Sequence, residues 1–288
     1  MSKQTIILDL AGIPIRVESD GFLSEDPGIL ADYLKPEQDA AHVLKVTMAD
    51  VLPKPEGSGI YTGGDFLVYR AGESVIRYIG DISRNEESAY LHTRREGTMT
   101  EATFCRVVLD RKISGKQLLR ALDVNHLITC HRGILLHASF IEYEGRAILF
   151  TAPSGTGKST QARLWCEHAG ASLVNGDRAV VRILDGRAFA CGIPMSGSSS
   201  VRRNVTLPLG AIVCLSQAPE NRIRKLRGVR AFRWIWEGCT LNVWDRADVE
   251  LATRTVTEVI TQVPVYHLAC TPDQGAVQLL KHTLEVEP

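Results

Sequence analysis

Hydrophobic and polar residues alternate in short runs along the first part of the chain. Typical runs are IPIRV (13–17), FLVYR (66–70), SVIRYI (74–79) and FCRVVL (104–109), separated by clusters of Gly, Asp, Asn and Pro. Side chains of a strand point alternately to opposite faces, so such runs between turn residues are typical of strands. The pattern predicts an antiparallel, β-rich region over residues 5–110.

The spacing of the apolar residues becomes helical after residue 113. Ser114 followed by Gln117 resembles a capping box, and leucines then recur near helical spacing as far as Leu127. We expect one helix over about 115–130 to join a smaller β-rich N-terminal accessory domain (1–112) to a second domain (113–288). From 133 onward strand and helix patterns alternate, which predicts an α/β domain with a mixed or parallel sheet.

One stretch of the second domain carries a recognisable chemical signal, AILFTAPSGTGKSTQARLW (147–165). Its first apolar residues, 147–150, predict a strand buried on both faces. The residues after the small-residue loop predict a helix, and Gly170 stands where that helix could end. The order is therefore strand, loop, helix.

A loop in this position turns backbone N–H groups toward one concavity at a helix N-terminus, where an anion is favoured. The segment matches G-x-x-x-x-G-K-[ST] except at its first position, where Ala152 replaces glycine. Lys158 can reach the β- and γ-phosphates of a nucleotide, and the Ser159 hydroxyl can bind Mg²⁺. The predicted nucleotide-binding residues are Ser154, Gly155, Thr156, Gly157, Lys158, Ser159 and Thr160.

A second apolar run, 171–174, ends at Asn175, Gly176 and Asp177. Ligands of open α/β sheets bind beyond the carboxyl ends of the strands, where a carboxylate is useful as a metal ligand or a base. We expect Asp177 to be such a group, with Ser159 and Asp177 as the predicted metal ligands. An ordinary turn aspartate is the alternative.

Composition excludes several classes of function. The chain of 288 residues carries 33 basic and 33 acidic side chains, so no overall field favours nucleic acid or an anionic membrane. The longest apolar runs are too short for a membrane-spanning helix, and Asp9 and Gly12 interrupt the first one. We expect a cytoplasmic protein.

The seven cysteines are scattered, and no two of them form C-x-x-C. Such a pattern is typical of reduced, mostly buried thiols. The sequence supports neither a disulfide framework nor a zinc site.

Several separated segments together resemble the P-loop kinases related to HPr kinase/phosphorylase, whose nucleotide core is similar to that of phosphoenolpyruvate carboxykinases. The segments are LLHASFIEYEGRAILFTAPSGTGKST, LVNGDRAVV, GIPMSGSS, PLGAIVCLSQ and VPVYHLACTPDQGAVQLL, in this order over about residues 114–280. The resemblance implies transfer of a phosphoryl group from ATP, with Mg²⁺, to a hydroxyl. By the same resemblance His137, Lys158 and Asp177 are the catalytic residues.

The chain departs from that family at one position. The family usually has two adjacent carboxylates where this sequence has Gly176 and Asp177. Asp177 then serves as metal ligand, as base, or as both, and His137 assists; a core histidine is the alternative for His137.

Three functions remain open at this point. The first is an ATP-dependent kinase acting on a serine or threonine of a protein or peptide, or on a small hydroxylated metabolite. The second is a nucleotide-dependent switch or ATPase without a dedicated acceptor, and the third is a carboxykinase-type enzyme. GIPMSGSSS (192–200) could close on phosphates or on the acceptor, or be a surface turn. The basic stretch 222–233 could bind an acidic partner or a phosphate group, or be a solvated face. A homo-oligomer is also left open.

Overall fold

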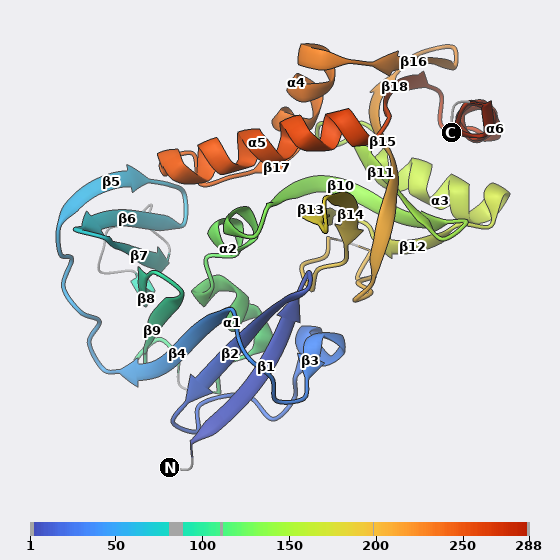
Figure 1. The fold of residues 1–288 in the computed structure, drawn as a ribbon. Coiled ribbons are helices and arrows are strands. Elements are labelled where there is room, and N and C mark those ends of the chain that lie inside the picture. Colours follow the sequence, from blue (N-terminus) through green and yellow to red (C-terminus); the bar gives the residue numbers. More distant parts are fainter. Residues whose placement is uncertain (1–2, 81–88, 110–111, 198, 287–288) are drawn as a thin grey trace. The chain divides into compact units, whose positions relative to one another are not determined.

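The computed structural model describes residues 3–80, 89–109, 112–197 and 199–286 (Figure 1). The chain divides into two compact units, Met1–Val124 and Asn125–Pro288. The predicted boundary lies after residue 112, whereas this division places residues 113–124 in the first unit as well. In the described part of the chain no helix is both long and apolar enough to span a membrane.

The first unit is built on one nine-stranded sheet with the strand order β3-β1-β2-β4-β9-β8-β7-β6-β5. Its elements are β1 (Gln4–Leu10), β2 (Ile13–Ser19), the 3-10 helix η1 (Gly28–Tyr33), β3 (Leu34–Lys35), β4 (His42–Ala49), β5 (Ser58–Thr62), β6 (Phe66–Ala71), β7 (Ser74–Gly80), β8 (Ala89–Glu96), β9 (Met99–Cys105) and α1 (Gly115–Ala121). Strand β2 alternates strictly between buried and half-buried residues, as its sequence pattern predicts.

The expectation of a purely antiparallel region is wrong at the centre of this sheet. Strand β4 pairs in parallel with both β2 and β9, whereas the remaining pairs are antiparallel. A parallel pair needs a crossover of a dozen or more residues, and the segment between β2 and β4 is long enough to supply one. The run FCRVVL also ends its strand at Cys105, and Val107 and Val108 are exposed.

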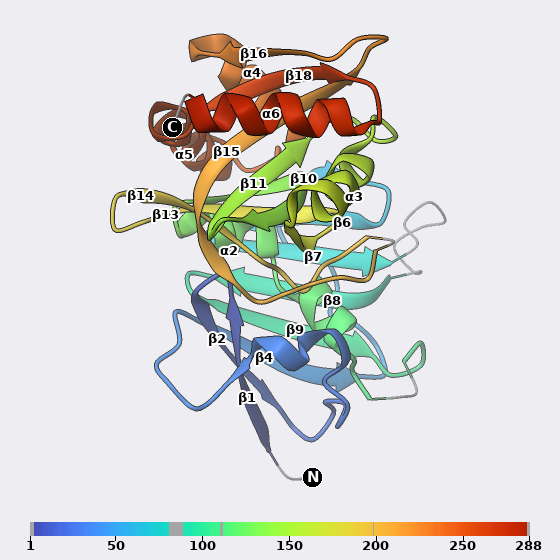
Figure 2. The same cartoon turned by 90° about the vertical axis from the view of Figure 1, so that its right-hand side faces the viewer.

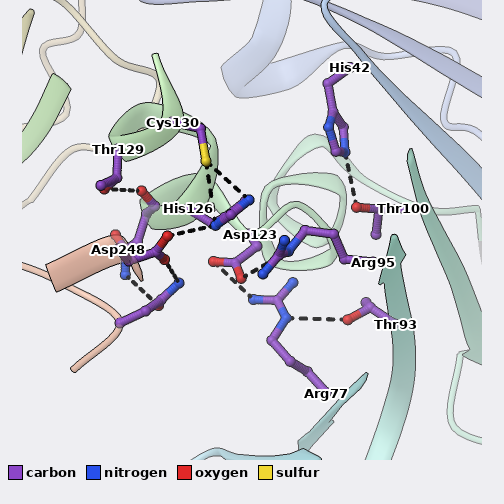
Figure 3. Close-up of polar contacts among 12 residues, drawn as sticks. His42, Arg77, Thr93, Arg95, Thr100, Asp123, His126, Thr129, Cys130 and Asp248 are labelled. Atoms are coloured by element: carbon purple, nitrogen blue, oxygen red, sulfur yellow. Dashed lines mark hydrogen bonds and ion pairs between the residues drawn. The ribbon is translucent and has the colours of Figure 1, made fainter. Parts of the chain in front are cut away.

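The predicted helix over 115–130 is two helices, α1 and α2 (Val124–Cys130). The capping box is confirmed, because the Ser114 N–H donates to Gln117 Oε1 over 2.7 Å. The break comes at Leu122, whose backbone is extended, and the next residue, Asp123, is buried. Its carboxylate lies 3.8 Å from the Arg77 guanidinium and 3.9 Å from that of Arg95 (Figure 3). Partners in the first unit therefore interrupt a pattern that is helical in the sequence.

The second unit contains a second nine-stranded sheet, with helices packed on it. Its elements after α2 are β10 (Gly133–Tyr143), β11 (Arg146–Thr151), α3 (Lys158–Ala169), β12 (Ser172–Asn175), β13 (Arg178–Leu184), β14 (Arg187–Cys191), β15 (Thr206–Gln217), β16 (Arg222–Leu226), α4 (Gly228–Gly238), β17 (Cys239–Thr240), α5 (Arg246–Gln262), β18 (Val265–Cys270) and α6 (Gln274–Val286). The molecule is thus a mixed α/β protein with two large sheets.

Helices cover both faces of the second sheet. Trp165 of α3 and Leu280 of α6 belong to the apolar cluster on one face, and Ile235 of α4 and Val256 of α5 to the cluster on the other. Figure 2 shows α3 and α6 on the face toward the viewer. Strand β15 contributes side chains to both clusters, since its buried residues point alternately to the two faces of the sheet. This three-layer packing explains why its central strands are hydrophobic without interruption.

Two long strands of this sheet change partners along their length. Strand β10 pairs with β13 up to His137 and with β11 from Ala138 onward, and β15 changes from β14 to β11 and β18. Strands β11, β15 and β18 are mutually parallel, so their carboxyl ends meet at one edge of the sheet. That edge is where the candidate site lies.

Candidate functional site

The site begins with the loop of residues 152–157, here called the glycine loop, which joins β11 to α3. Gly155 and Gly157 have φ angles of 77° and 120°, which residues with a Cβ rarely adopt. An added Cβ would meet no atom within 4 Å at either position, so the backbone angle and not crowding requires glycine there. Helix α3 ends at Gly170 in the left-handed conformation, as predicted. The predicted order of strand, loop and helix is confirmed.

Lys158 is the first residue of α3 and its side chain is buried within the loop. Its Nζ donates to the carbonyl oxygens of Ala152 at 2.9 Å and Pro153 at 3.3 Å. Burial lowers the pKa of the Lys158 amine, and the Asp177 carboxylate partly opposes that shift. The ammonium is therefore held in an environment where a further negative charge would be favourable.

Asn175 shapes the turn that carries Asp177, and sequence reasoning missed this role. Its fully buried side chain accepts from the N–H groups of Asp177 and Arg178, both at 3.0 Å. Its amide donates to the carbonyls of Ile193 at 3.1 Å and Met195 at 2.8 Å. The Asn-Gly pair signalled a turn, but the sequence did not show that the asparagine also binds the 192–205 loop.

His137 lies on β10 where that strand changes its pairing partner, and its imidazole faces the Asp177 carboxylate. His137 Nδ1 lies 3.4 Å from Asp177 Oδ1, and Arg178 Nε lies 3.4 Å from Asp177 Oδ2. Burial lowers the pKa of the His137 imidazole, Lys158 lowers it further, and Asp177 opposes both effects. The imidazole is therefore mainly neutral at pH 7 and can accept a proton. Arg178, which also donates to Thr240 Oγ1 at 3.1 Å, was not predicted.

The 192–205 loop packs against the Gly176–Asp177 turn. A Cβ added at Gly197 would lie 2.9 Å from Asp177 Cβ, and one added at Gly176 would lie 2.5 Å from Ser199 Oγ. Gly176 is not among the residues with positive φ, so crowding by Ser199 is what keeps a side chain out. Arg203 forms an ion pair with Glu142, with Nη1 and Oε2 3.0 Å apart. Small residues thus let this loop approach the carboxylate.

The remaining predicted residues lie around the glycine loop. Ser159 Oγ is 3.5 Å from the Gly176 carbonyl oxygen, so the Ser159 hydroxyl and the Asp177 turn are close. Ser154 is exposed on the loop. A cavity of about 600 Å³ opens beside the loop; it is lined by Gly155, Thr156, Gly157, Thr160, Gln161, Leu215, Gln217, Ala218, Cys270, Thr271 and Pro272.

Gln161 stands out among the residues that line this cavity. It is buried, and its Nε2 donates to Cys270 Sγ at 3.3 Å. Within the described residues, its Oε1 has no hydrogen-bond partner. Gln161 is therefore part of the cavity wall, with its Oε1 closed off from solvent.

The basic stretch 222–233 lies elsewhere, on β16 and the first turns of α4. Arg222 pairs with Glu220 at 2.6 Å and Arg233 with Glu237 at 2.8 Å. Leu226 is buried, whereas the basic residues of the stretch are exposed. The stretch presents a solvated face.

Comparisons with known proteins give a family and distant structural neighbours. Residues 116–274 match the model of a family described as SynChlorMet cassette protein ScmC. Among solved structures the chain is similar to the HPr(Ser) kinase/phosphatase from Coxiella burnetii, with a TM-score of 0.31 and 13% identity over 54% of this chain and 99% of that chain. The structural relation to HPr kinase is therefore distant. The search of curated proteins gave no match.

Proposed function

The chain belongs to the family described as SynChlorMet cassette protein ScmC, and from that premise we propose that it is an ATP-dependent phosphotransferase. The phosphoryl acceptor is a hydroxyl, either a serine or threonine of a protein or peptide or a small hydroxylated metabolite. The observation that carries the proposal is the convergence of Lys158 with the His137–Asp177 pair at one edge of the sheet. A cation for phosphate and a group that can accept a proton are what phosphoryl transfer requires.

The glycine loop fits a nucleotide phosphate chain. The first N–H groups of α3 lack partners within the helix, and the helix dipole favours an anion at the same place. Lys158 supplies a buried ammonium beside them, and an anion there would offset the cost of its burial. The neighbouring cavity, lined by Thr160 and Gln161, is large enough for the nucleoside part.

Ser159 and Asp177 are the residues that would hold Mg²⁺. A hydroxyl and a carboxylate are oxygen ligands of the kind that this ion prefers, and the short Ser159–Gly176 approach brings both to one side of the loop. Bound there, Mg²⁺ would neutralise charge on the β- and γ-phosphate oxygens. Asp177 can also orient the acceptor hydroxyl, while neutral His137 accepts its proton.

One observation favours a nucleotide-dependent switch or ATPase as the second candidate. Gly176 offers no carboxylate, and Ser199 occupies the space that a side chain at this position would need. With one carboxylate fewer than the kinases that it resembles, the site could bind or hydrolyse ATP without a dedicated acceptor.

The deciding experiment incubates the full chain with γ-labelled ATP, Mg²⁺ and the hydroxyl-bearing products of neighbouring genes, and separates acceptor-bound from free phosphate. We expect labelled acceptor with the wild type. Lys158→Ala should lower transfer by at least about a hundredfold, the usual effect of removing one electrostatic contact to a transition state. Lys116→Ala, which removes an exposed lysine of α1, is the matched control and should keep the wild-type rate.

Asp177→Asn separates chemistry from binding, because it keeps the size of the side chain but removes its charge. Transfer should fall by orders of magnitude, whereas nucleotide affinity, carried mainly by the loop amides and Lys158, should change far less. If the wild type releases only free phosphate with every acceptor, the switch replaces the kinase. If it neither binds nor hydrolyses ATP, both proposals are wrong.

A further inference from the structure

A histidine, a cysteine and a carboxylate converge where α2 contacts the start of α5, away from the glycine loop. His126 and Cys130 are one helical turn apart on α2, and Asp248 lies in the first turn of α5 (Figure 3). One potential ligand atom from each residue lies within 4.8 Å of the other two. All three residues belong to the second unit.

The distances within this cluster are those that a single metal ion bridges. Asp248 Oδ1 lies 2.7 Å from His126 Nδ1, and Cys130 Sγ lies 3.3 Å from His126 Nε2 and 3.7 Å from Nδ1. Zinc bonds of about 2.0–2.3 Å in a tetrahedral site place neighbouring ligand atoms roughly 3 to 4 Å apart. On binding, the contact between the histidine and the aspartate lengthens as the ion replaces the proton between them, while the cysteine and aspartate ligand atoms already lie within 4.8 Å of each other.

The same distances argue against a nucleophilic Cys-His pair. Because the sulfur is almost equally far from both ring nitrogens, it lies against the ring and not in line with the lone pair of either nitrogen. A general base for the thiol would need that alignment. An ion close to all three groups also needs the imidazole to turn about its Cβ–Cγ bond, so that a ring nitrogen points toward the ion.

Burial gives the cluster an inner and an outer end. Asp248 is 1% exposed, and its other oxygen, Oδ2, accepts from Asn242 Nδ2 at 3.0 Å. Asn242 Oδ1 in turn accepts from Asn125 Nδ2 at 3.5 Å. A buried carboxylate is stabilised by a positive charge or by hydrogen-bond donors beside it, and its fixed second oxygen is typical of a metal ligand oriented by an outer partner. Cys130 is exposed, so an ion can enter from its side.

We propose that His126, Cys130 and Asp248 form a zinc site, with the fourth position open to a ligand from solvent. Thiolate, imidazole and carboxylate together suit Zn²⁺, whereas Mg²⁺ and Ca²⁺ prefer sites made of oxygen atoms. Asn242 is a positioning residue that orients Asp248. This site is separate from Ser159 and Asp177 and does not rest on the proposed phosphotransfer.

The test uses the full chain, reduced and freed of metal with a chelator, without nucleotide. Titration with Co²⁺ should give tetrahedral ligand-field bands and a sulfur-to-cobalt charge-transfer band that saturate at one equivalent, and Zn²⁺ should remove them. Cys130→Ser should abolish the charge-transfer band. Cys166→Ser, which removes a half-buried thiol of α3, is the matched control and should keep it. Absence of the band, or its survival in Cys130→Ser, would overturn the proposal.

A second measurement excludes a merely structural role for the cluster. Asn242→Ala should weaken Zn²⁺ binding by about 10- to 100-fold, as loss of an outer hydrogen bond to a metal ligand commonly does. Its affinity is measured by competition with a chromophoric chelator, after circular dichroism has shown that the variant folds. Unchanged zinc affinity in folded Asn242→Ala would contradict the positioning role. If zinc raises the melting temperature of Cys130→Ser as much as that of the wild type, the ion does not bind at Cys130.

Discussion

Lys158 and His137 acquire their proposed roles from their surroundings, because neither residue type alone implies them. Burial lowers the pKa of both side chains, and each lies within electrostatic reach of Asp177. For Lys158 the low dielectric strengthens attraction to an anion. For His137 it favours the neutral imidazole, the form that can accept a proton.

The state of His137 predicts a pH dependence of stability. Its folded pKa lies below the ordinary value of 6.5, so just below pH 6.5 the unfolded chain binds more protons than the folded chain. The contribution of His137 to the free energy of unfolding is therefore complete above pH 6.5 and is lost as the pH falls toward the folded pKa. Replacing His137 with Gln removes this contribution.

Urea unfolding between about pH 5 and about pH 7.5 tests this linkage. All four tryptophans lie in the second unit, so tryptophan fluorescence follows the unit that contains His137. Stability of the wild type relative to His137→Gln should rise with pH across this range. A difference that stays constant would show that the imidazole titrates alike in the folded and unfolded chain.

At the scale of the elements, the turn after β12 shows most clearly that packing, and not the backbone angle, can require a glycine. The sequence left it open whether Gly176 is required by a positive φ, and the structure assigns the requirement to Ser199 instead. Gly176→Asp should therefore destabilise the second unit, because its Cβ would lie 2.5 Å from Ser199 Oγ and 2.9 Å from Ser199 Cβ. Adding Ser199→Gly removes both atoms and should restore stability.

This pair of substitutions also tests whether the absence of a second carboxylate limits phosphoryl transfer. If phosphoryl transfer is limited by the lack of a second carboxylate, the double variant should exceed the rate of Ser199→Gly alone, which is the matched control. Melting temperature and transfer rate are measured on the same preparations. A double variant as unstable as Gly176→Asp would show that other atoms exclude the side chain.

Helix α2 shows how packing overrides a local pattern. The leucine spacing of 118–127 continues through Asp123, but that carboxylate is buried beside Arg77 and Arg95. The chain becomes extended at Leu122 to place it there. The break makes α2 a separate helix, which carries His126 and Cys130 toward α5.

At the scale of the whole molecule, nucleotide binding should stabilise the chain by mass action. With free nucleotide at about 100 times its Kd, the folded state gains about 2.7 kcal/mol. We expect ATP with Mg²⁺ to delay unfolding of the second unit, followed by tryptophan fluorescence, and ATP with EDTA to do so much less. Lys158→Ala should show little stabilisation at the same concentration. If ATP stabilises the chain equally in EDTA, the proposal that the site binds a metal ion is wrong.

The sequence alone determined several local features of the chain. The strand over 147–150, the loop with its two glycines, the helix ending at Gly170 and the capping box at Ser114 are all confirmed. Each depends on the backbone preferences of residues a few positions apart, which the order of amino acids specifies directly. The catalytic, nucleotide-binding and metal-binding roles of the loop and of Asp177 stay predictions.

Tertiary structure alone decided which distant residues meet. It set the parallel pairing of β4, the contacts of Asn175 with Ile193 and Met195, and the meeting of His126 and Cys130 with Asp248. A search for C-x-x-C could not find that last cluster, although the four-residue spacing on α2 was one visible signal. The third ligand comes from α5, and only the packing of α5 beside α2 brings its carboxylate to them. Such contacts reflect the burial of side chains against one another across the chain, which no local pattern records.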